Sequence, residues 1–188
     1  MATTITPITH SDRVERLLLP YRTDLGDDFA GYRNHIYRVL SYAMHFLNGA
    51  DTDRQMVETV LVYHDLGLWT AGDLAYLEPS EALALKENAA QGWGLDPDVL
   101  RAAIHWHHKV FPYAGKGADV VNAVRRADWI DATQGKVRHG VSKGQIAAVA
   151  AALPDEGFYD TLTRLAGDLN GGRTFAGLIK VLRRVYKI

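Results

Sequence analysis

Residues 57–69 read VETVLVYHDLGLW, an apolar run that ends in the polar doublet His64-Asp65. The apolar residues recur at helical spacing, so this stretch predicts a helix with one buried face. Histidine and aspartate are costly to bury unless a partner compensates for the lost hydration. The doublet therefore predicts a polar site inside a helical protein, and a divalent cation is a natural partner for it.

The same helical periodicity continues along nearly the whole chain. Helices are expected over residues 12–19, 32–47, 51–65, 80–92, 97–109, 118–133, 142–153, 158–169 and 174–186. Asp51 or Thr52 would cap the third of these helices, and Gly67 would end it. Asp96-Pro97 would open the fifth. Residues 21–31, 69–79, 111–117 and 135–140 are expected to be turns or loops. Without strand patterns or a linker, residues 1–188 predict an all-α, single-domain helical bundle.

The composition excludes several classes of function. Hydrophobic residues make up 47% of 188 residues, which excludes a disordered chain. The net charge is -1, so no overall basic field would recruit nucleic acid or an anionic membrane. Because cysteine is absent, disulfides, thiolate metal sites and cysteine nucleophiles are excluded. The chain shows no secretory signal and no apolar run near the roughly 18 residues of a membrane span, so we expect a cytoplasmic protein.

The metal prediction depends on four residues, each beside an apolar helical run: His35, His64, Asp65 and Asp128. Two imidazoles and two carboxylates suit one ion of manganese, iron, cobalt, nickel, zinc or magnesium, without selecting among them. Such a ligand set leaves positions open for water and substrate, as a catalytic site requires. Each residue also has a purely structural interpretation; Asp128, for example, could pair with Arg125 or Arg126.

The residues around these four carry a family resemblance. NHIYRV surrounds His35, LVYHDLG surrounds the doublet, and RRADWIDA contains Asp128. Over about residues 30–140, this order of motifs resembles the HD superfamily of metal-dependent phosphohydrolases. The resemblance implies a helical fold with one ion held by the four residues, and many members hydrolyse phosphate esters or nucleotides. We expect the helices of residues 142–188 to pack on this core.

A second group of histidines closes the helix expected over residues 97–109: His105, His107 and His108. Members of the superfamily often carry a histidine pair here, which His107 and His108 match best, although His105 stays open. These side chains would bind a second metal, contact a phosphate or act as an acid. A helix end that favours cationic groups is the structural alternative.

A second ion is disfavoured, because two-metal relatives usually carry a further histidine and residues 67–103 contain none. The carboxylates that could replace it are Glu78, Glu81 and Glu87, with Glu78 closest in register. Solvation at the surface is the expected role of each.

The mechanism that follows is hydrolysis by a water molecule bound to the cation, which lowers the pKa of water from about 15.7 toward 7 in the best zinc case. Asp65 would accept or orient the proton of this water, and His107 or His108 would protonate the leaving group. The small-molecule substrate would be phosphorylated, and Arg38, on one helical face with His35, is the first candidate for a phosphate contact. Weaker candidates, for which a solvated surface role is favoured, are Lys109, Lys116, Arg125 and Arg138.

Other interpretations stay open. YRNHIYRV is also similar to relatives such as cyanamide hydratase, which implies a metal-dependent hydratase or lyase of a small nitrogenous or carbonyl compound, with Arg38 orienting the motif. A dinuclear iron oxygenase, supported by a few relatives, needs the disfavoured second ion. A non-catalytic module would use the basic helix of residues 174–186 as a partner surface, although a packing helix is favoured there. Trp69, Trp93, Trp106 and Trp129 would line a pocket or fill gaps between helices. Sequence alone does not set the oligomeric state.

Overall fold

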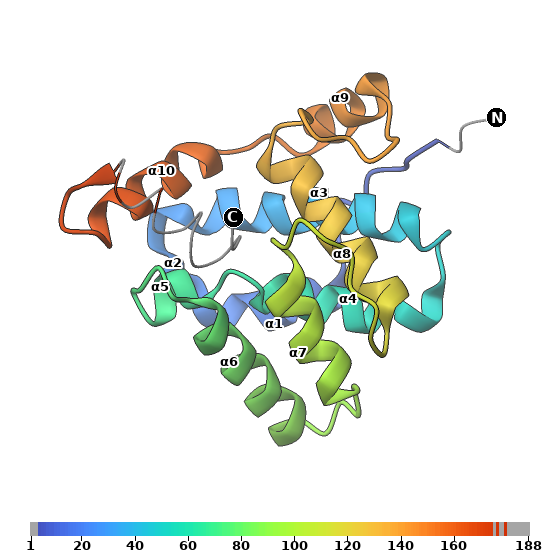
Figure 1. The fold of residues 1–188 in the computed structure, drawn as a ribbon, viewed down its shortest axis with the longest axis horizontal. Coiled ribbons are helices and arrows are strands. Elements are labelled where there is room, and N and C mark those ends of the chain that lie inside the picture. The colour runs from blue at the N-terminus through green and yellow to red at the C-terminus, as the bar shows by residue number, and fades with distance from the viewer. Residues whose placement is uncertain (1–3, 175, 177–178, 180–188) are drawn as a thin grey trace.

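The computed structural model describes residues 4–174, 176 and 179, and the described part is helical and without strands, which confirms the all-α class (Figure 1). The longer helices are α1 (Asp12–Leu18), α3 (Phe29–Phe46), α4 (Asp51–Tyr63), α6 (Leu77–Ala90), α7 (Pro97–Trp106), α8 (Ala118–Ala132), α9 (Lys143–Ala152) and α10 (Phe158–Asp168). Single turns connect some of them: η1 (Leu19–Tyr21), α2 (Arg22–Leu25), η2 (Gly26–Asp28) and α5 (Gly67–Thr70). The basic face predicted for residues 174–186 lies outside the described residues.

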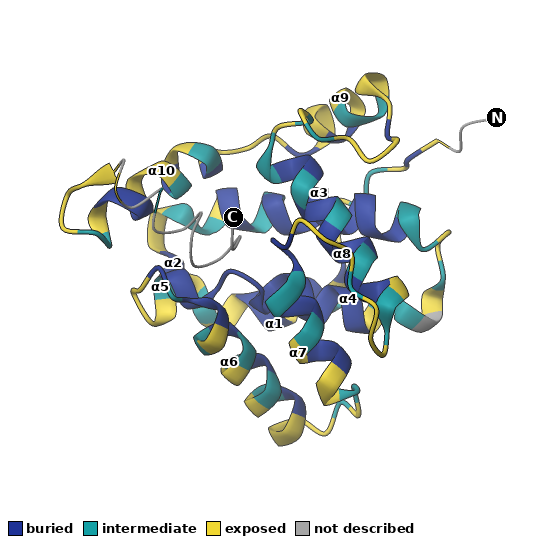
Figure 2. Ribbon diagram, in the orientation of Figure 1, coloured by how far each residue is buried: buried dark blue, intermediate teal, exposed yellow. Residues whose placement is uncertain are grey.

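The helices pack around α3, which runs through the middle of the molecule (Figure 1). α8 packs against α3, α4 and α7, and α4 also packs against α3 and α7. α6 lies beside α7, α1 beside α4, and α9 and α10 both contact α3. The buried residues concentrate where these helices face one another (Figure 2), for example at Ile36, Leu61 and Val124, which are fully buried. The core therefore lies between the helices that carry the predicted ligands.

Side-chain caps form at the starts of α7 and α9 but not at the start of α4. Asp96 accepts hydrogen bonds from the Asp98 and Val99 amides at the start of α7, as expected, and Ser142 forms a capping box at α9. The expected caps of α4 are wrong, because Ala50 is its N-cap residue and makes no side-chain hydrogen bond. Asp51 instead lies in the first turn, where its negative charge interacts favourably with the positive end of the helix dipole.

Three predicted boundaries are also wrong, one of them the start of α6, which is Leu77 rather than residue 80. The stretch expected to be a loop over residues 21–31 consists largely of short helical turns, and α3 begins at Phe29. α7 ends at Trp106, three residues early, so His107 and His108 lie in the turn that follows it. Arg125 of α8 donates hydrogen bonds to the carbonyl oxygens of Lys109 and Val110 just after this turn.

Gly67 is expected to end the helix that carries His64-Asp65, but α4 ends earlier, at Tyr63, and Gly67 begins α5. A side chain at this position would collide with the Tyr76 carbonyl oxygen and lie 2.9 Å from Ser80 Oγ. The Gly67 amide donates a 2.9 Å hydrogen bond to the same Ser80 hydroxyl. Glycine is therefore required here because α5 approaches the start of α6 too closely for a Cβ atom.

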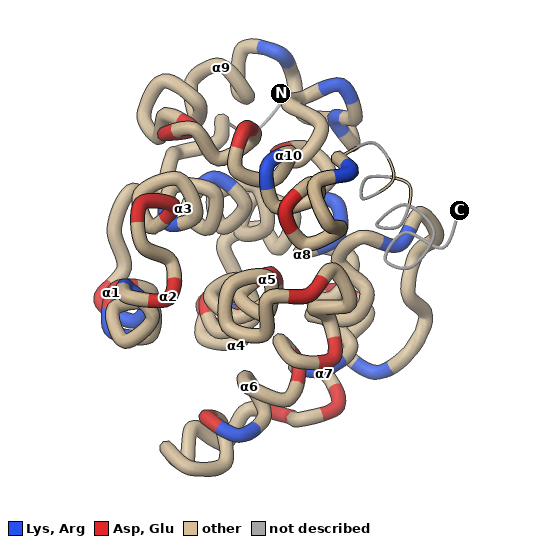
Figure 3. Tube along the Cα trace, turned by 90° about the vertical axis from the view of Figure 1, so that its left-hand side faces the viewer, with Lys and Arg blue, Asp and Glu red and all other residues tan. Residues whose placement is uncertain are grey.

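The surface carries charges of both signs. α1, α6 and α10 each contain acidic and basic residues (Figure 3), which agrees with a net charge near zero.

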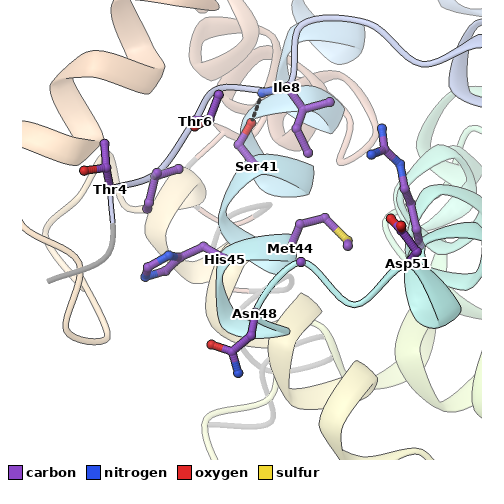
Figure 4. Close-up of a pocket in the computed structure, with 11 residues that line it drawn as sticks. Thr4, Thr6, Ile8, Ser41, Met44, His45, Asn48 and Asp51 are labelled. Carbon is purple, nitrogen blue, oxygen red and sulfur yellow. Dashed lines mark hydrogen bonds between the residues drawn. The ribbon is translucent and has the colours of Figure 1, made fainter.

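No helix among the described residues combines the length and apolar character needed to cross a bilayer. A hollow of about 410 Å³ lies between the N-terminal segment and the end of α3 (Figure 4), where Ile8 donates a hydrogen bond to Ser41, away from the predicted ligands.

Candidate metal centre

Six buried side chains converge in the interior of the bundle. They are His35 of α3, His64 and Asp65 after α4, His107 and His108 after α7, and Asp128 of α8. The structure thus brings together the four predicted metal ligands and both histidines of the predicted pair. Three overlapping groups of three can each place one ligand atom within 4.8 Å of the other two. The donors are nitrogen and oxygen only, which suits the divalent ions expected from the sequence.

Both adjacent pairs reach the cluster because each follows the end of a helix. α4 ends at Tyr63 and α7 at Trp106, so His64-Asp65 and His107-His108 lie in turns. Adjacent residues within a helix point about 100° apart, and a turn removes that constraint. Both side chains of the doublet can therefore reach the cluster because α4 ends directly before His64.

In one half of the cluster, His35 and His64 face each other with Asp128 beside them. The two Nε2 atoms are 3.0 Å apart, and Asp128 Oδ1 lies 3.5 Å from His35 Nε2. Asp65 Oδ2 lies 3.4 Å from His64 Nε2. Four donor atoms from three segments thus surround one small volume.

In the other half, the same two carboxylates face the histidine pair. Asp65 Oδ1 lies 3.2 Å from His107 Nε2, and Asp128 Oδ2 lies 3.1 Å from His108 Nδ1. Each carboxylate therefore directs one oxygen to each half of the cluster.

The outward ring nitrogen of every histidine in the cluster has a partner. His64 Nδ1 donates to the Leu61 carbonyl oxygen at 2.7 Å, and His107 Nδ1 donates to the Ile104 carbonyl oxygen at 2.5 Å. His108 Nε2 is hydrogen-bonded to the Tyr76 hydroxyl at 2.6 Å. Metal-binding histidines usually have such an outer partner, which fixes the tautomer and turns the other nitrogen toward the ion.

Several inward atoms have no hydrogen-bond partner among the described residues although they are buried: Asp65 Oδ1, His107 Nε2 and Asp128 Oδ1. Each such atom costs about 1–3 kcal/mol in desolvation when it is left without a partner. A cation bound among them would compensate that cost, so the residues present fit a divalent metal ion.

The electrostatics of the cluster favour the ligating forms of His64 and Asp128. Burial lowers the pKa of His64 to about 4, which keeps its imidazole neutral near pH 7. Burial alone would raise the pKa of Asp128, but His108, His107 and His35 lower it to about 2. For His108, burial opposes the charged form, yet Asp128 and Asp65 raise its pKa to about 9. Without a cation, His108 therefore supplies part of the positive charge that the carboxylates need.

The third histidine and the predicted replacement carboxylates lie elsewhere. His105 Nδ1 pairs with Glu81 at 2.7 Å between α7 and α6, outside the cluster. Glu78 is exposed and Glu87 is half-buried on α6. Among the described residues, no glutamate belongs to a group able to hold a metal.

The predicted phosphate contacts are mostly engaged with protein groups. Arg38 directs its guanidinium to Asp131, with Nε 2.6 Å from Oδ1 and Nη2 2.9 Å from Oδ2, and is 2% exposed. This placement matches the orienting role expected if phosphate is not the substrate. Arg125 binds main-chain carbonyls after α7, and Lys116 pairs with Asp96 at the surface.

The two remaining cations differ in burial. Lys109 is buried directly after His108, whereas Arg138 is exposed. Only Lys109 of this pair lies next to the cluster in sequence.

The tryptophans mainly support the packing of neighbouring segments. Trp69 donates to Asp28, and Trp106 donates to the Phe111 carbonyl oxygen. Trp93 lies under the guanidinium of Arg13. Trp129 is half-buried on α8, one residue after Asp128.

Three residues near the cluster were not predicted. Asp131 accepts a 2.7 Å hydrogen bond from His35 Nδ1, Tyr76 contacts His108, and the Phe158 ring stacks on His35 at 4.3 Å. Asp131 had a usable signal, because it lies one helical turn after Asp128 within RRADWIDA. Tyr76 and Phe158 had none, because nothing local links them to the histidines.

Comparisons with protein-family models, curated proteins and solved structures found no match. The buried cluster is compatible with a site of the HD type, and its histidines and aspartates could hold a metal ion.

Proposed function

We propose that this protein is a metal-dependent hydrolase of the HD superfamily that uses an activated water molecule on a small substrate. The observation that supports the proposal is the set of inward nitrogen and oxygen atoms that are buried without hydrogen-bond partners among the described residues. His35, His64, Asp65 and Asp128 would hold one divalent cation.

Charge balance supports a divalent ion. Asp65 and Asp128 bring two negative charges into the interior, and both side chains are almost fully buried. The third buried carboxylate, Asp131, is already paired with Arg38. Buried charges need compensation, and one divalent cation supplies the two positive charges that Asp65 and Asp128 lack.

When bound, such a cation would lower the pKa of a coordinated water molecule from about 15.7 toward neutrality. Asp65 would accept or orient the proton of the attacking water, because its carboxylate faces both halves of the cluster. His107 and His108 are the candidates for protonating the leaving group, and Tyr76 holds His108 in place.

Two substrate classes follow from different observations. Phosphate esters and nucleotides are the first class, because the motifs around the cluster resemble phosphohydrolases of the superfamily. The second is hydration of a small nitrogenous compound, and the engagement of Arg38 and Arg125 with protein groups favours it. Uncharged substrates need no dedicated arginine, whereas phosphate usually does.

A metal analysis followed by a substrate screen tests the proposal. The protein would be purified, stripped with a chelator and reloaded with manganese, iron, cobalt, nickel, zinc or magnesium in turn. Phosphate monoesters, phosphodiesters, nucleotides and small nitriles would then be assayed side by side. Metal-dependent turnover in either class is the expected result, with nitriles distinguishing hydratase from phosphohydrolase. Failure to bind any of these ions would contradict the proposal and favour a non-catalytic module.

A further inference from the structure

Behind His35 lies a chain of two further charged side chains. His35 Nδ1 donates to Asp131 Oδ2 at 2.7 Å, and Arg38 holds both oxygens of Asp131 with its Nε and Nη2 groups. All three residues are buried. The Arg38 Nη1 group also donates to the carbonyl oxygens of Leu153 and Pro154, so the guanidinium is fixed on every side that carries hydrogens.

Helical spacing produces this chain. His35 and Arg38 are three residues apart on α3, and Asp128 and Asp131 are three residues apart on α8. Residues at this spacing share a helix face, and α3 packs against α8. The two helices therefore meet at two levels, one at the cluster and one at the charged pair behind it.

We propose that Asp131 and Arg38 are positioning residues that set the tautomer and orientation of His35, and thereby the affinity of the cluster for its divalent cation. This inference rests on the proposed function, since it assumes that His35 is a metal ligand. Asp131 would act directly on His35, and Arg38 would act through Asp131.

His35 differs from its neighbours in the kind of outer partner. The outward nitrogens of His64 and His107 donate to neutral main-chain carbonyls, whereas that of His35 donates to a carboxylate. A carboxylate accepts a stronger hydrogen bond and raises the electron density of the opposite nitrogen. His35 Nε2 would therefore be the strongest imidazole donor of the three.

Arg38 offsets the cost of burying the Asp131 carboxylate beside His35. An unpaired Asp131 would add a third buried negative charge beside Asp65 and Asp128. Arg38 instead donates to both oxygens of Asp131, with Nε 2.6 Å from Oδ1 and Nη2 2.9 Å from Oδ2, so this carboxylate is already paired. Because Arg38 neutralises Asp131, Asp65 and Asp128 are the two carboxylates of this region left to be neutralised by the cation.

A structural role alone would be to tie α3 to α8 and to the segment before α10. The two roles differ in what they change. A tie between helices contributes to the free energy of unfolding of the metal-free protein, whereas a positioning role changes metal affinity in protein that is still folded.

The test measures cobalt or zinc affinity by titration calorimetry in wild type and in Asp131→Asn. The expected result is an affinity about 10- to 100-fold weaker in the variant, the range typical for the loss of an outer partner. Glu15→Gln is the matched control, because Glu15 also pairs with an arginine of α3, Arg33, at 2.9 Å. Arg38→Lys, which keeps the charge but loses the two-pronged contact, would be compared with Arg33→Lys in the same way.

A second measurement needs no variant. Nitrogen-15 chemical shifts of the His35 ring in the zinc-loaded wild type should show hydrogen on Nδ1 and none on Nε2, which would face the ion. The opposite tautomer would overturn the proposal even if Asp131→Asn did not fold.

Affinities of Asp131→Asn within about twofold of wild type, a change below about 0.4 kcal/mol, would also overturn it. If wild type itself bound none of manganese, iron, cobalt, nickel, zinc and magnesium, the proposed function would fail first and this inference with it.

Discussion

At the scale of single residues, Asp65 has the most demanding position in the cluster. Its Oδ2 atom lies 3.4 Å from His64 Nε2, and its Oδ1 atom lies 3.2 Å from His107 Nε2. Burial alone would raise the pKa of Asp65, but His64, His107 and His108 hold it well below the usual range. A carboxylate that stays ionised between two groups of histidines is suited both to bind a cation and to orient water.

Asp65→Ala should therefore abolish stoichiometric metal binding and turnover while leaving helical content nearly intact. Helicity should persist because the residue lies in a turn after α4 rather than within the apolar core. Elemental analysis and far-ultraviolet circular dichroism would check both parts. A variant with full metal content and unchanged turnover would contradict the role assigned to Asp65.

His107 lies in the cluster whereas His105 lies outside it, so the two histidines can be compared by substitution. His107→Ala should retain the metal but lose about 10²- to 10⁴-fold in turnover, the usual contribution of a general acid. His105→Ala should change neither, because His105 pairs with Glu81 outside the cluster. Steady-state kinetics on metal-loaded protein would measure both variants. Equal losses in the two would show that proximity to the cluster does not matter.

At the scale of elements, the points where α4 and α7 end decide which side chains reach the cluster. The turns after α4 and α7 present paired ligands, and close packing of α5 on α6 fixes the first of these turns. Asp28, at the end of η2, links this region to α10: it accepts hydrogen bonds from Trp69 of α5 and from Thr161 and Arg164 of α10. Asp28 thus ties α5, which follows the first of these turns, to α10.

Gly67→Ala should destabilise the protein by about 1–3 kcal/mol, because the added Cβ atom would collide with the Tyr76 carbonyl oxygen. Gly144→Ala is the matched control: Gly144 lies in α9 with open space around it, so the change should be neutral or stabilising by up to about 1 kcal/mol. Urea unfolding would give both free energies. Equal effects at the two positions would refute the packing explanation.

Asp28→Asn should lower the free energy of unfolding by about 1 kcal/mol near neutral pH. Although burial alone would raise the pKa of Asp28, hydrogen bonds from Trp69, Arg164 and Thr161 lower it in the folded state. The stabilisation should therefore be fully present above the unfolded pKa of about 3.9 and be lost as pH falls through the lower folded value.

Unfolding of wild type and Asp28→Asn from pH 7 to pH 3 would check this, since the difference between them should shrink on acidification. Asp168→Asn serves as a control, because Asp168 is an exposed partner of the same Arg164. An effect of Asp28→Asn that did not vary with pH would count against the assigned hydrogen bonds.

At the scale of the whole molecule, the cluster connects segments that are far apart in the chain. About half of the chain separates His35 from Asp128 in sequence, yet their ligand atoms lie 3.5 Å apart. A cation bound by His35, His64, Asp65 and Asp128 would join α3, α8 and the turn after α4. It would therefore oppose global unfolding rather than stiffen one loop.

Adding a suitable divalent ion at about 100 times its Kd should raise the free energy of unfolding by about 2.7 kcal/mol, if the ion binds only the folded state. Thermal or urea unfolding with and without chelator would measure the change. Asp65→Ala should show no such rise, and an equal rise in that variant would point to binding elsewhere.

Sequence alone was sufficient for the fold class and for the residues that form the cluster. The helical period is a local property, so α1, α3, α4 and α6 to α10 were predicted to within a few residues. His64-Asp65 was recognisable because it interrupts an apolar helix. Whether the protein is an enzyme of the HD superfamily stays a prediction that the metal and substrate experiments must test.

The partners of these residues depend on tertiary structure. Packing of α3 on α8 brings Asp131 to His35 and Arg38, and packing of α7 on α6 assigns His105 to Glu81. Local periodicity cannot specify such pairs, because contacts between residues about 25 to 100 positions apart depend on how whole helices cross. The chain by itself determined which groups could bind a cation, and only the packed bundle decided which of them face it and which hold the others in place.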